Sequence, residues 1–188
     1  MRYKLLVSIF TGVLSFSATA ADTYTVDPRH TFPSFEIDHL GFSIQRGRFN
    51  LTEGKITLAP ASASGSIDIS IDAASISTGL ADLEKHLRSE DFLDVTHFPK
   101  IIFQSKQLTF DKAQLVGADG DLTLHGVTKP VHLTVDRFHC GFNLLLIKNV
   151  CGANATATIK RSDFGVDKYA PALGDDVKVI IQIEAIKD

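Results

Sequence analysis

In the stretch GSIDISID, residues Gly65–Asp72, the apolar residues Ile67, Ile69 and Ile71 alternate with polar residues without a fault. Successive side chains of a β-strand point to opposite faces, so this stretch buries one face and exposes the other. One-sided burial is typical of antiparallel sheets, because strands of a parallel sheet are apolar on both faces. The stretch therefore predicts an antiparallel, all-β protein.

Other runs along the chain show the same period of two. They are Phe35–His39, Arg48–Leu51, Ile101–Lys106, Leu122–His125, Val131–Asp136, Ala155–Lys160 and Val177–Ile183. Turn-forming residues separate them, at 50–54, 59–62, 117–120 and 125–130. Eight short strands at this spacing predict a sandwich or a barrel, and full closure would remove exposed sheet edges.

One segment breaks the period of two. Within Thr78–Asp94, the residues Leu80, Leu83 and Leu87 have helical spacing. Pro99 then ends any helix and opens the next strand. We expect a short helical insertion between two strands of the sheet.

The first twenty residues have the layout of a secretory signal peptide. A basic start, Met1–Lys4, precedes the mostly apolar Leu5–Phe16, and Ala18-Thr19-Ala20 supplies small residues for cleavage. The alternative is a membrane anchor, but the apolar run is about 12 residues, against about 20 needed to span a bilayer. We therefore expect residues 1–20 to be a signal peptide and residues 21–188 to form one domain.

The charge of the chain argues against a nucleic-acid partner. The sequence has 19 Lys and Arg against 22 Asp and Glu, a formal net charge of −3. Without Arg2 and Lys4 there are 17 basic residues against 22 acidic ones, a net charge of −5. Binding to phosphates needs a basic surface, so this balance excludes that class of function.

Cys140 and Cys151 are the two cysteines of the chain. In an exported protein they predict a disulfide, and the alternative is a pair of buried free thiols. The sequence contains no C-x-x-C redox motif, which argues against thiol–disulfide catalysis.

Motifs for chemistry are few. None of the seven histidines forms a metal-binding pattern such as H-E-x-x-H, and no G-x-S-x-G elbow is present. The sequence therefore predicts no catalytic residue and no metal site. A periplasmic enzyme acting on a small amphiphile, with His39 or His86 as acid or base, stays as an alternative.

The interior of the barrel is open to two interpretations. Outside residues 1–20 the chain has eleven Phe and no Trp, which could fill a core or line a cavity. An eight-stranded barrel either fills with side chains or holds one small ligand. The small residues Ala155 and Ala157 on one inner face would favour a cavity, but the pattern alone leaves both readings open.

Several motifs carry a family resemblance. Two are long: KHLRSEDFLD at Lys85–Asp94 and GDLTLHGVTKPV at Gly120–Val131. The shorter ones are Tyr24–Asp27, His39–Phe42, His97–Lys100 and Arg161–Gly165. In this order and spacing the chain resembles the YceI-like family of exported bacterial proteins, from Asp22 to Lys187.

The resemblance implies an eight-stranded antiparallel, lipocalin-like barrel with a short helical insertion. It also implies an elongated apolar cavity for an isoprenoid or another long-chain amphiphile, such as a polyisoprenoid quinone. The family is periplasmic and not established as enzymatic, so the resemblance implies no cofactor beyond a bound isoprenoid or quinone-like lipid.

The expected ligand-binding residues come from the strands, the helical insertion and the rim. The strand residues are Phe35, Ile37, His39, Phe103, Leu122, Leu124, Val131, Leu133, Ala155 and Ala157. The insertion would act as a lid with Leu83, His86, Leu87 and Phe92, and Tyr169 suits the rim. Lys85 and Arg88 would either contact a polar head group beside His86 or form an ordinary solvent-exposed face of the helix.

We therefore expect a periplasmic binding or carrier protein for isoprenoid-type or other long-chain lipids. It would exchange its ligand with a membrane or a membrane redox partner, without chemistry on the ligand. The oligomeric state stays open, with a homodimer as one alternative. A third reading, besides the carrier and the enzyme, is an envelope stress or interaction protein with a filled barrel.

Overall fold

The computed structural model describes residues 21–188. The signal peptide expected over residues 1–20 lies outside the described residues, so it stays a prediction. Within residues 21–188 no helix combines the length and apolar character needed to cross a membrane.

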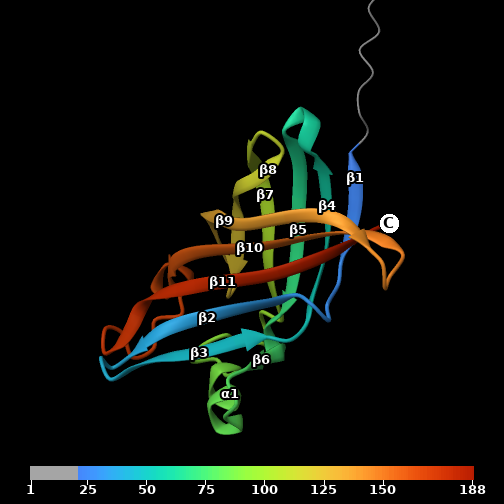
Figure 1. Ribbon diagram of the computed structural model, residues 1–188. Helices are drawn as coiled ribbons and strands as arrows, with labels where there is room; N and C mark the ends of the chain where they lie inside the picture. The colour runs from blue at the N-terminus through green and yellow to red at the C-terminus, as the bar shows by residue number, and fades with distance from the viewer. Residues whose placement is uncertain (1–20) are drawn as a thin grey trace, which may run out of the picture.

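The described chain is built mainly from strands, with one short α-helix (Figure 1). The strands are β1 (Asp22–Val26), β2 (Phe32–His39), β3 (Ser43–Phe49), β4 (Thr52–Ala59), β5 (Ser64–Asp72), β6 (Ile76–Ser77), β7 (Lys100–Asp111), β8 (Gln114–Leu124), β9 (Val127–Asn143), β10 (Lys148–Lys160) and β11 (Leu173–Lys187). The helix is α1 (Ala81–Leu87), and the 3₁₀ turns are Pro60–Ser62, Ala73–Ser75 and Arg161–Phe164.

Eight strands close into an antiparallel barrel. The order is β1-β4-β5-β7-β8-β9-β10-β11, and β11 pairs with β1 to close the circle, with Tyr24 opposite Lys187. Every pairing in the sheet is antiparallel. The predicted fold class, an eight-stranded antiparallel barrel with a short helical insertion, is confirmed.

The remaining strands lengthen the barrel wall at one end. Strand β11 is long enough to have two partners on one side: its end pairs with β1, at Ala185 and Val26, and its middle pairs with β2, at Val179 and Phe35. Strand β3 then pairs with β2, and β6 pairs with β3. Helix α1 lies at this end of the molecule (Figure 1).

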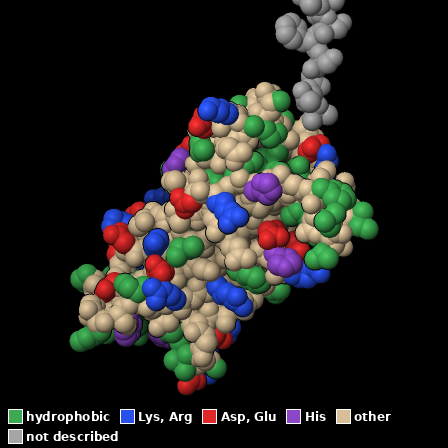
Figure 2. Space-filling model, in the orientation of Figure 1, with side chains coloured by type: hydrophobic (Ala, Val, Ile, Leu, Met, Phe, Trp, Pro, Cys, Tyr) green, Lys and Arg blue, Asp and Glu red, His purple; other side chains and the backbone are tan. Residues whose placement is uncertain are grey.

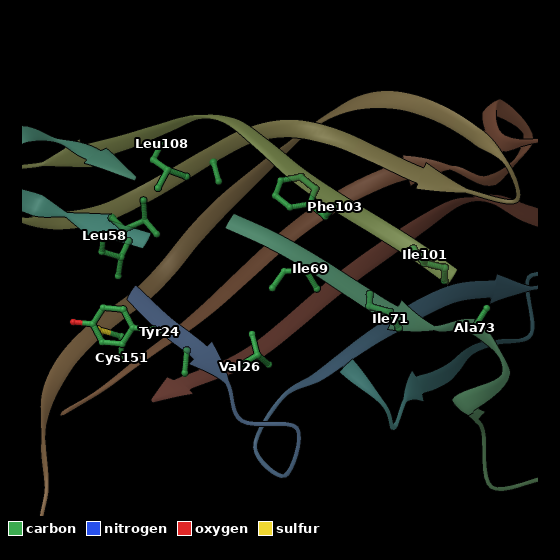
Figure 3. Packing of buried hydrophobic residues seen from close by; sticks show 13 residues of the cluster. Tyr24, Val26, Leu58, Ile69, Ile71, Ala73, Ile101, Phe103, Leu108 and Cys151 are labelled. Atoms are coloured by element: carbon green, nitrogen blue, oxygen red, sulfur yellow. The ribbon is translucent and has the colours of Figure 1, made fainter. Parts of the chain in front are cut away.

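The buried apolar side chains come from strands around the whole barrel (Figure 3). The stretch Gly65–Asp72 contributes Ile69 and Ile71, and the neighbouring strand β7, which pairs with it, contributes Ile101 and Phe103. Ile67 is partly buried and packs against the same cluster. The alternation in Gly65–Asp72 therefore does separate an inner face from an outer one.

Two glycines that predicted a turn lie inside a strand instead. The turn expected at 117–120 is wrong, because these residues belong to β8. A Cβ atom on Gly120 would lie 2.7 Å from the ring of Phe103 and would also collide with the carbonyl oxygen of Gln104. Gly120 therefore permits a close approach of β7, where the register shifts between Ser105 and Gln107.

Two other expected turns are shorter in the structure. At 50–54, only Asn50 and Leu51 interrupt the chain, since β4 begins at Thr52. At 125–130, His125 and Gly126 alone make the turn, with φ of 51° and 74°, and β9 follows at once. Two successive residues with positive φ match the twist of an antiparallel hairpin, so this turn needs no further residues.

The helical insertion is shorter than the segment Thr78–Asp94 in which it was expected. Only Ala81–Leu87 is α-helical, and Leu80 precedes its first turn as an exposed residue. The Glu84 side chain accepts hydrogen bonds from the backbone N–H groups of Thr78 and Gly79, at 2.8 and 3.1 Å. These bonds fix the entry into α1.

The predicted disulfide is present. Cys140 on β9 stands directly opposite Cys151 on β10, with Cα atoms 4.0 Å apart. Cys151 is buried in the barrel wall, whereas Cys140 is exposed. A disulfide of this kind indicates an oxidising compartment.

The loop between β1 and β2 is held by a buried carboxylate. Asp27 is 4% exposed, and it accepts hydrogen bonds from the Arg29 backbone N–H and from Arg29 Nε, at 3.0 and 3.1 Å. His30 Nδ1 lies 2.9 Å from the same carboxylate. The Arg29 side chain is the main cause that holds the pKa of Asp27 well below its usual range.

We expect Asp27→Asn to lower the free energy of unfolding at pH 7 by about 1–3 kcal/mol, because it removes a charged hydrogen-bond acceptor. The folded pKa lies below the unfolded value of about 4, so the stabilisation is complete above that value and is lost as the pH falls. Urea unfolding at pH 7 and pH 3 should show the difference between the two proteins shrinking at low pH. Asp111→Asn, at an exposed site, is the control, and a pH-independent difference for Asp27→Asn would contradict the prediction.

Candidate ligand cavity

The barrel encloses a cavity of about 610 Å³, which lies within the usual size range of small-molecule sites. Its wall consists mainly of aliphatic and aromatic side chains that point inward from the strands. One end is closed by buried side chains, among them Tyr24, Leu58, Leu115 and Cys151. The interior of this barrel is therefore not filled by its own side chains.

The other end of the cavity opens to solvent. The exposed residues of its wall are His39, Leu40, Tyr169 and Ala172, and they come from two neighbouring segments. His39, at the end of β2, stands opposite Leu173 at the start of β11. These residues define the mouth of the cavity, beside the β2–β3 turn and the loop that precedes β11.

Every residue expected to contact a ligand lies on the wall of this one cavity. The strands contribute Phe35, Ile37, His39, Phe103, Leu122, Leu124, Val131, Leu133, Ala155 and Ala157, and the mouth region contributes Leu83, His86, Leu87, Phe92 and Tyr169. Strand parity brings the first group together, because all of its members occupy inner positions. Contact between these residues and a ligand stays a prediction.

The segment around α1 covers part of the mouth. Leu83, His86 and Leu87 face the cavity from the helix. The His86 ring packs on Phe92 with its centroid at 4.9 Å, and Tyr169 lies 6.1 Å from both rings. These aromatic contacts join the helical segment to the loop that precedes β11.

An ion pair reinforces this junction. Lys168 Nζ lies 3.0 Å from Asp91 Oδ1, and Asp91 is the main cause that raises the pKa of Lys168. Because both groups are substantially exposed, the pair itself contributes little stability. Its geometry nevertheless keeps the two covering segments side by side.

The two basic residues of the helical segment do not line the cavity. Arg88 donates hydrogen bonds to the carbonyl oxygens of Ala74 and Ile76, at 2.7 and 2.9 Å, and so attaches the helix to the wall. Lys85 is exposed and is absent from the cavity wall. Of the three candidates for a head-group contact on this segment, only His86 reaches the cavity.

Arg161 is a cavity residue that sequence reasoning missed. It is 4% exposed, and burial lowers its pKa, which the charges of Asp175 and Asp167 partly offset. Its guanidinium donates to four backbone carbonyl oxygens at 2.7–3.0 Å, and these belong to Val166, Lys168, Leu173 and Gly174. The motif Arg161–Gly165 drew attention to it, but only the folded loop supplies its partners.

We expect Arg161→Met to lower the free energy of unfolding by about 2–4 kcal/mol, because four backbone carbonyl oxygens around a buried guanidinium lose a charged donor. The loop that carries Tyr169 should also lose order. Urea unfolding measures the first effect, and limited proteolysis between residues 165 and 174 measures the second. Arg46→Met, which removes an exposed pair with Glu36, is the matched control and should cost less than about 1 kcal/mol.

Two buried threonines also face the cavity and were not predicted. The Thr31 hydroxyl donates to the Glu184 carbonyl oxygen and accepts from the Glu184 N–H group, both at 3.2 Å. Thr52 is 3% exposed, and its hydroxyl has no hydrogen-bond partner among the described residues. Thr52 therefore places a buried, unpaired hydroxyl behind a largely apolar wall.

We expect Thr52→Val to leave the ligand-free protein as stable as before, or to stabilise it by up to about 1 kcal/mol, because an unpaired buried hydroxyl is costly. Thr31→Val is the matched control and should destabilise the protein by about 1–2 kcal/mol, since it breaks two hydrogen bonds. Thermal or urea unfolding of both variants is the measurement. A large loss for Thr52→Val would mean that its hydroxyl is paired.

The alternative of an enzyme names His39 and His86 as acid or base. Both histidines line the cavity near its mouth. Among residues 21–188, neither ring has an acidic side chain within hydrogen-bonding distance. In the same part of the chain, His, Cys, Asp and Glu form no group of three that could hold a metal ion.

A closed antiparallel barrel with an apolar cavity, open at one end, defines the class of this protein. A family model described as the YceI-like domain matches residues 24–185. Protein YceI of Shigella flexneri is 34% identical over 192 residues, which covers 100% of this chain and 99% of the relative. The chain belongs to the YceI-like family.

Solved structures show the same fold. The Campylobacter jejuni YCEI protein has a TM-score of 0.69 and 27% identity, over 81% of this chain and 90% of that one. A polyisoprenoid binding domain from Saccharophagus degradans, implicated in plant cell wall breakdown, has a TM-score of 0.65 and 17% identity, over 88% of this chain and 98% of that one. At that identity the second likeness concerns the fold.

Proposed function

We propose that this protein is a periplasmic binding or carrier protein for isoprenoid-type or other long-chain amphiphilic lipids. The observation that carries the proposal is the single-ended apolar cavity of about 610 Å³. A chain that enters such a cavity leaves water along its whole length, while its head stays at the mouth. The Saccharophagus degradans domain of the same fold is named as a polyisoprenoid binding domain, which supports an isoprenoid as the ligand class.

The energetics of the cavity suit a long apolar chain. Each buried CH₂ group contributes about 0.8 kcal/mol before the costs of association are counted. About ten such groups offset those costs without any charged contact. The polar side chains at the mouth, His86 and Tyr169, suit an oxygen-bearing head group.

Two observations support the periplasm as its compartment. The N-terminal sequence has the layout of a signal peptide, and the Cys140–Cys151 disulfide indicates an oxidising environment. The protein would take up its lipid from a membrane and deliver it to a membrane or a membrane redox partner. We propose no chemistry on the ligand, because among residues 21–188 no acidic side chain pairs with His39 or His86 and would orient it as an acid or base.

Organic extraction of the protein, purified without detergent, followed by mass spectrometry tests the proposal. We expect a long-chain lipid in the extract at a substantial fraction of the protein concentration. An empty extract, combined with no binding of added quinone or prenyl alcohol, would rule out the carrier function. Turnover of such a lipid that disappears in His86→Ala while binding survives would instead favour an enzyme.

We expect Ala157→Phe to weaken lipid binding at least tenfold, because the ring would occupy the cavity that the ligand needs. Thr158→Phe is the matched control: it adds a ring on the same strand, but Thr158 is exposed and absent from the cavity wall. Titration with a fluorescent prenyl probe measures both affinities. Equal affinities for two folded variants would place the ligand outside the barrel.

A further inference from the structure

The hairpin between β9 and β10 ends in the most exposed apolar segment of the described chain. Within this segment, Phe142, Leu144, Leu145 and Ile147 are 59%, 83%, 93% and 75% exposed. We call residues Phe142–Ile147 the apolar tip. Figure 2 shows hydrophobic side chains gathered at the right-hand edge, where this turn lies in Figure 1. Soluble proteins rarely expose such a contiguous apolar patch without a partner.

The apolar tip projects beyond the barrel wall. Strand β9 has β8 as a neighbour only up to Thr134, and β10 has β11 as a neighbour only from Val150 onward. The end of the hairpin therefore pairs with itself alone. It is nevertheless ordered, because the Asn143 side chain accepts hydrogen bonds from the N–H groups of Leu145 and Leu146, at 2.9 and 3.1 Å. The disulfide joins its two strands just behind the tip.

The sequence of the β9–β10 hairpin differs in charge from the rest of the chain. From Arg137 to Ser162 the sequence contains no acidic residue, although the chain beyond residue 20 carries a net charge of −5. Lys148 directly follows the tip on β10, with its Nζ atom 3.3 Å from the Lys187 carbonyl oxygen, and Arg137 lies five residues before the tip on β9. Both are exposed, as is His139. An apolar end with basic residues behind it is the pattern of a segment that lies at a lipid–water interface.

We propose that the apolar tip inserts into the interfacial region of a phospholipid bilayer, with Lys148 and Arg137 against anionic head groups. A second copy of the chain fits the tip less well. A narrow, convex turn buries little area against another copy, whereas stable protein interfaces bury at least about 1,200 Å². Lipid chains adapt to any convex shape. Membrane attachment through the tip does not depend on the cavity holding a lipid, so the proposal goes beyond the proposed function.

The position of the tip also determines the direction in which the cavity mouth of a membrane-attached barrel would point. The mouth lies at the start of β11, where His39 stands opposite Leu173, and the tip lies beyond its other end, where Val150 stands opposite Ile186. The two therefore lie at opposite ends of a 15-residue strand. A barrel attached by the tip would hold its mouth away from that bilayer, where it would face a second membrane or a partner on that membrane.

Flotation of the purified protein with vesicles tests the proposal. We expect the protein to float with vesicles of phosphatidylcholine and phosphatidylglycerol at 7:3, and less with phosphatidylcholine alone. Leu144→Ser with Leu145→Ser should weaken the association about a hundredfold, about tenfold for each leucine. Lys148→Gln should reduce the preference for the anionic vesicles about fivefold. Failure of the unaltered protein to float would overturn the proposal.

Phe42→Ser is the matched control, because Phe42 is 88% exposed but lies in the β2–β3 turn beside the mouth. We expect it to float like the unaltered protein, and all variants should share one urea unfolding midpoint. Loss of flotation in Phe42→Ser alone would make the mouth the membrane face and overturn the proposal. Light scattering without vesicles is the last readout: a dimer that the leucine substitutions dissociate would assign the tip to a second copy and also overturn it.

Discussion

The hydrogen-bonded seam along β11 closes the barrel, and both the cavity and its mouth follow from that closure. This one strand pairs with β10 from Asp176 to Ile186 on one side, and with β1 and then β2 on the other. Closure satisfies the backbone groups that an open sheet would leave at its edges. It also turns the inner faces of all the strands toward one another. The cavity exists because those inner faces meet around a common axis without side chains large enough to fill it.

The character of the cavity follows from which residues occupy inner positions. Ala155 and Ala157 on β10 leave space that Phe or Leu would fill, and the aromatic and aliphatic side chains opposite supply an apolar wall. The polar side chains of the cavity wall differ in whether they have hydrogen-bond partners. Arg161 donates its hydrogen bonds to the loop at the mouth, whereas the buried Thr52 hydroxyl has no partner among the described residues. A site of this composition can hold an amphiphile by exclusion of water and can distinguish ligands by a few polar contacts.

The strand positions and the wall residues were largely readable from the sequence, because parity in a strand is a local property. Gly65–Asp72 predicts its own inner face, and the same rule places Phe35, Leu122 and Ala155 on the cavity wall. The rule failed where glycine has a second use. Gly120 permits close approach of β7 within a strand and does not mark a turn, and that distinction depends on a neighbour far away in the sequence.

The antiparallel barrel, the disulfide pair and the inward residues could be predicted from the sequence, since each follows from alternation, from the count of cysteines or from motifs shared with a family. What those residues do together depends on packing between distant segments. Contacts between distant segments give Arg161 its carbonyl partners and leave the Thr52 hydroxyl without one. They also let Arg88 attach the helix to the barrel wall. The exposure of the Phe142–Ile147 tip likewise appears only after folding, because β8 and β11 stop short of it. Local pattern specifies which face a side chain occupies, whereas long-range packing specifies what meets it there.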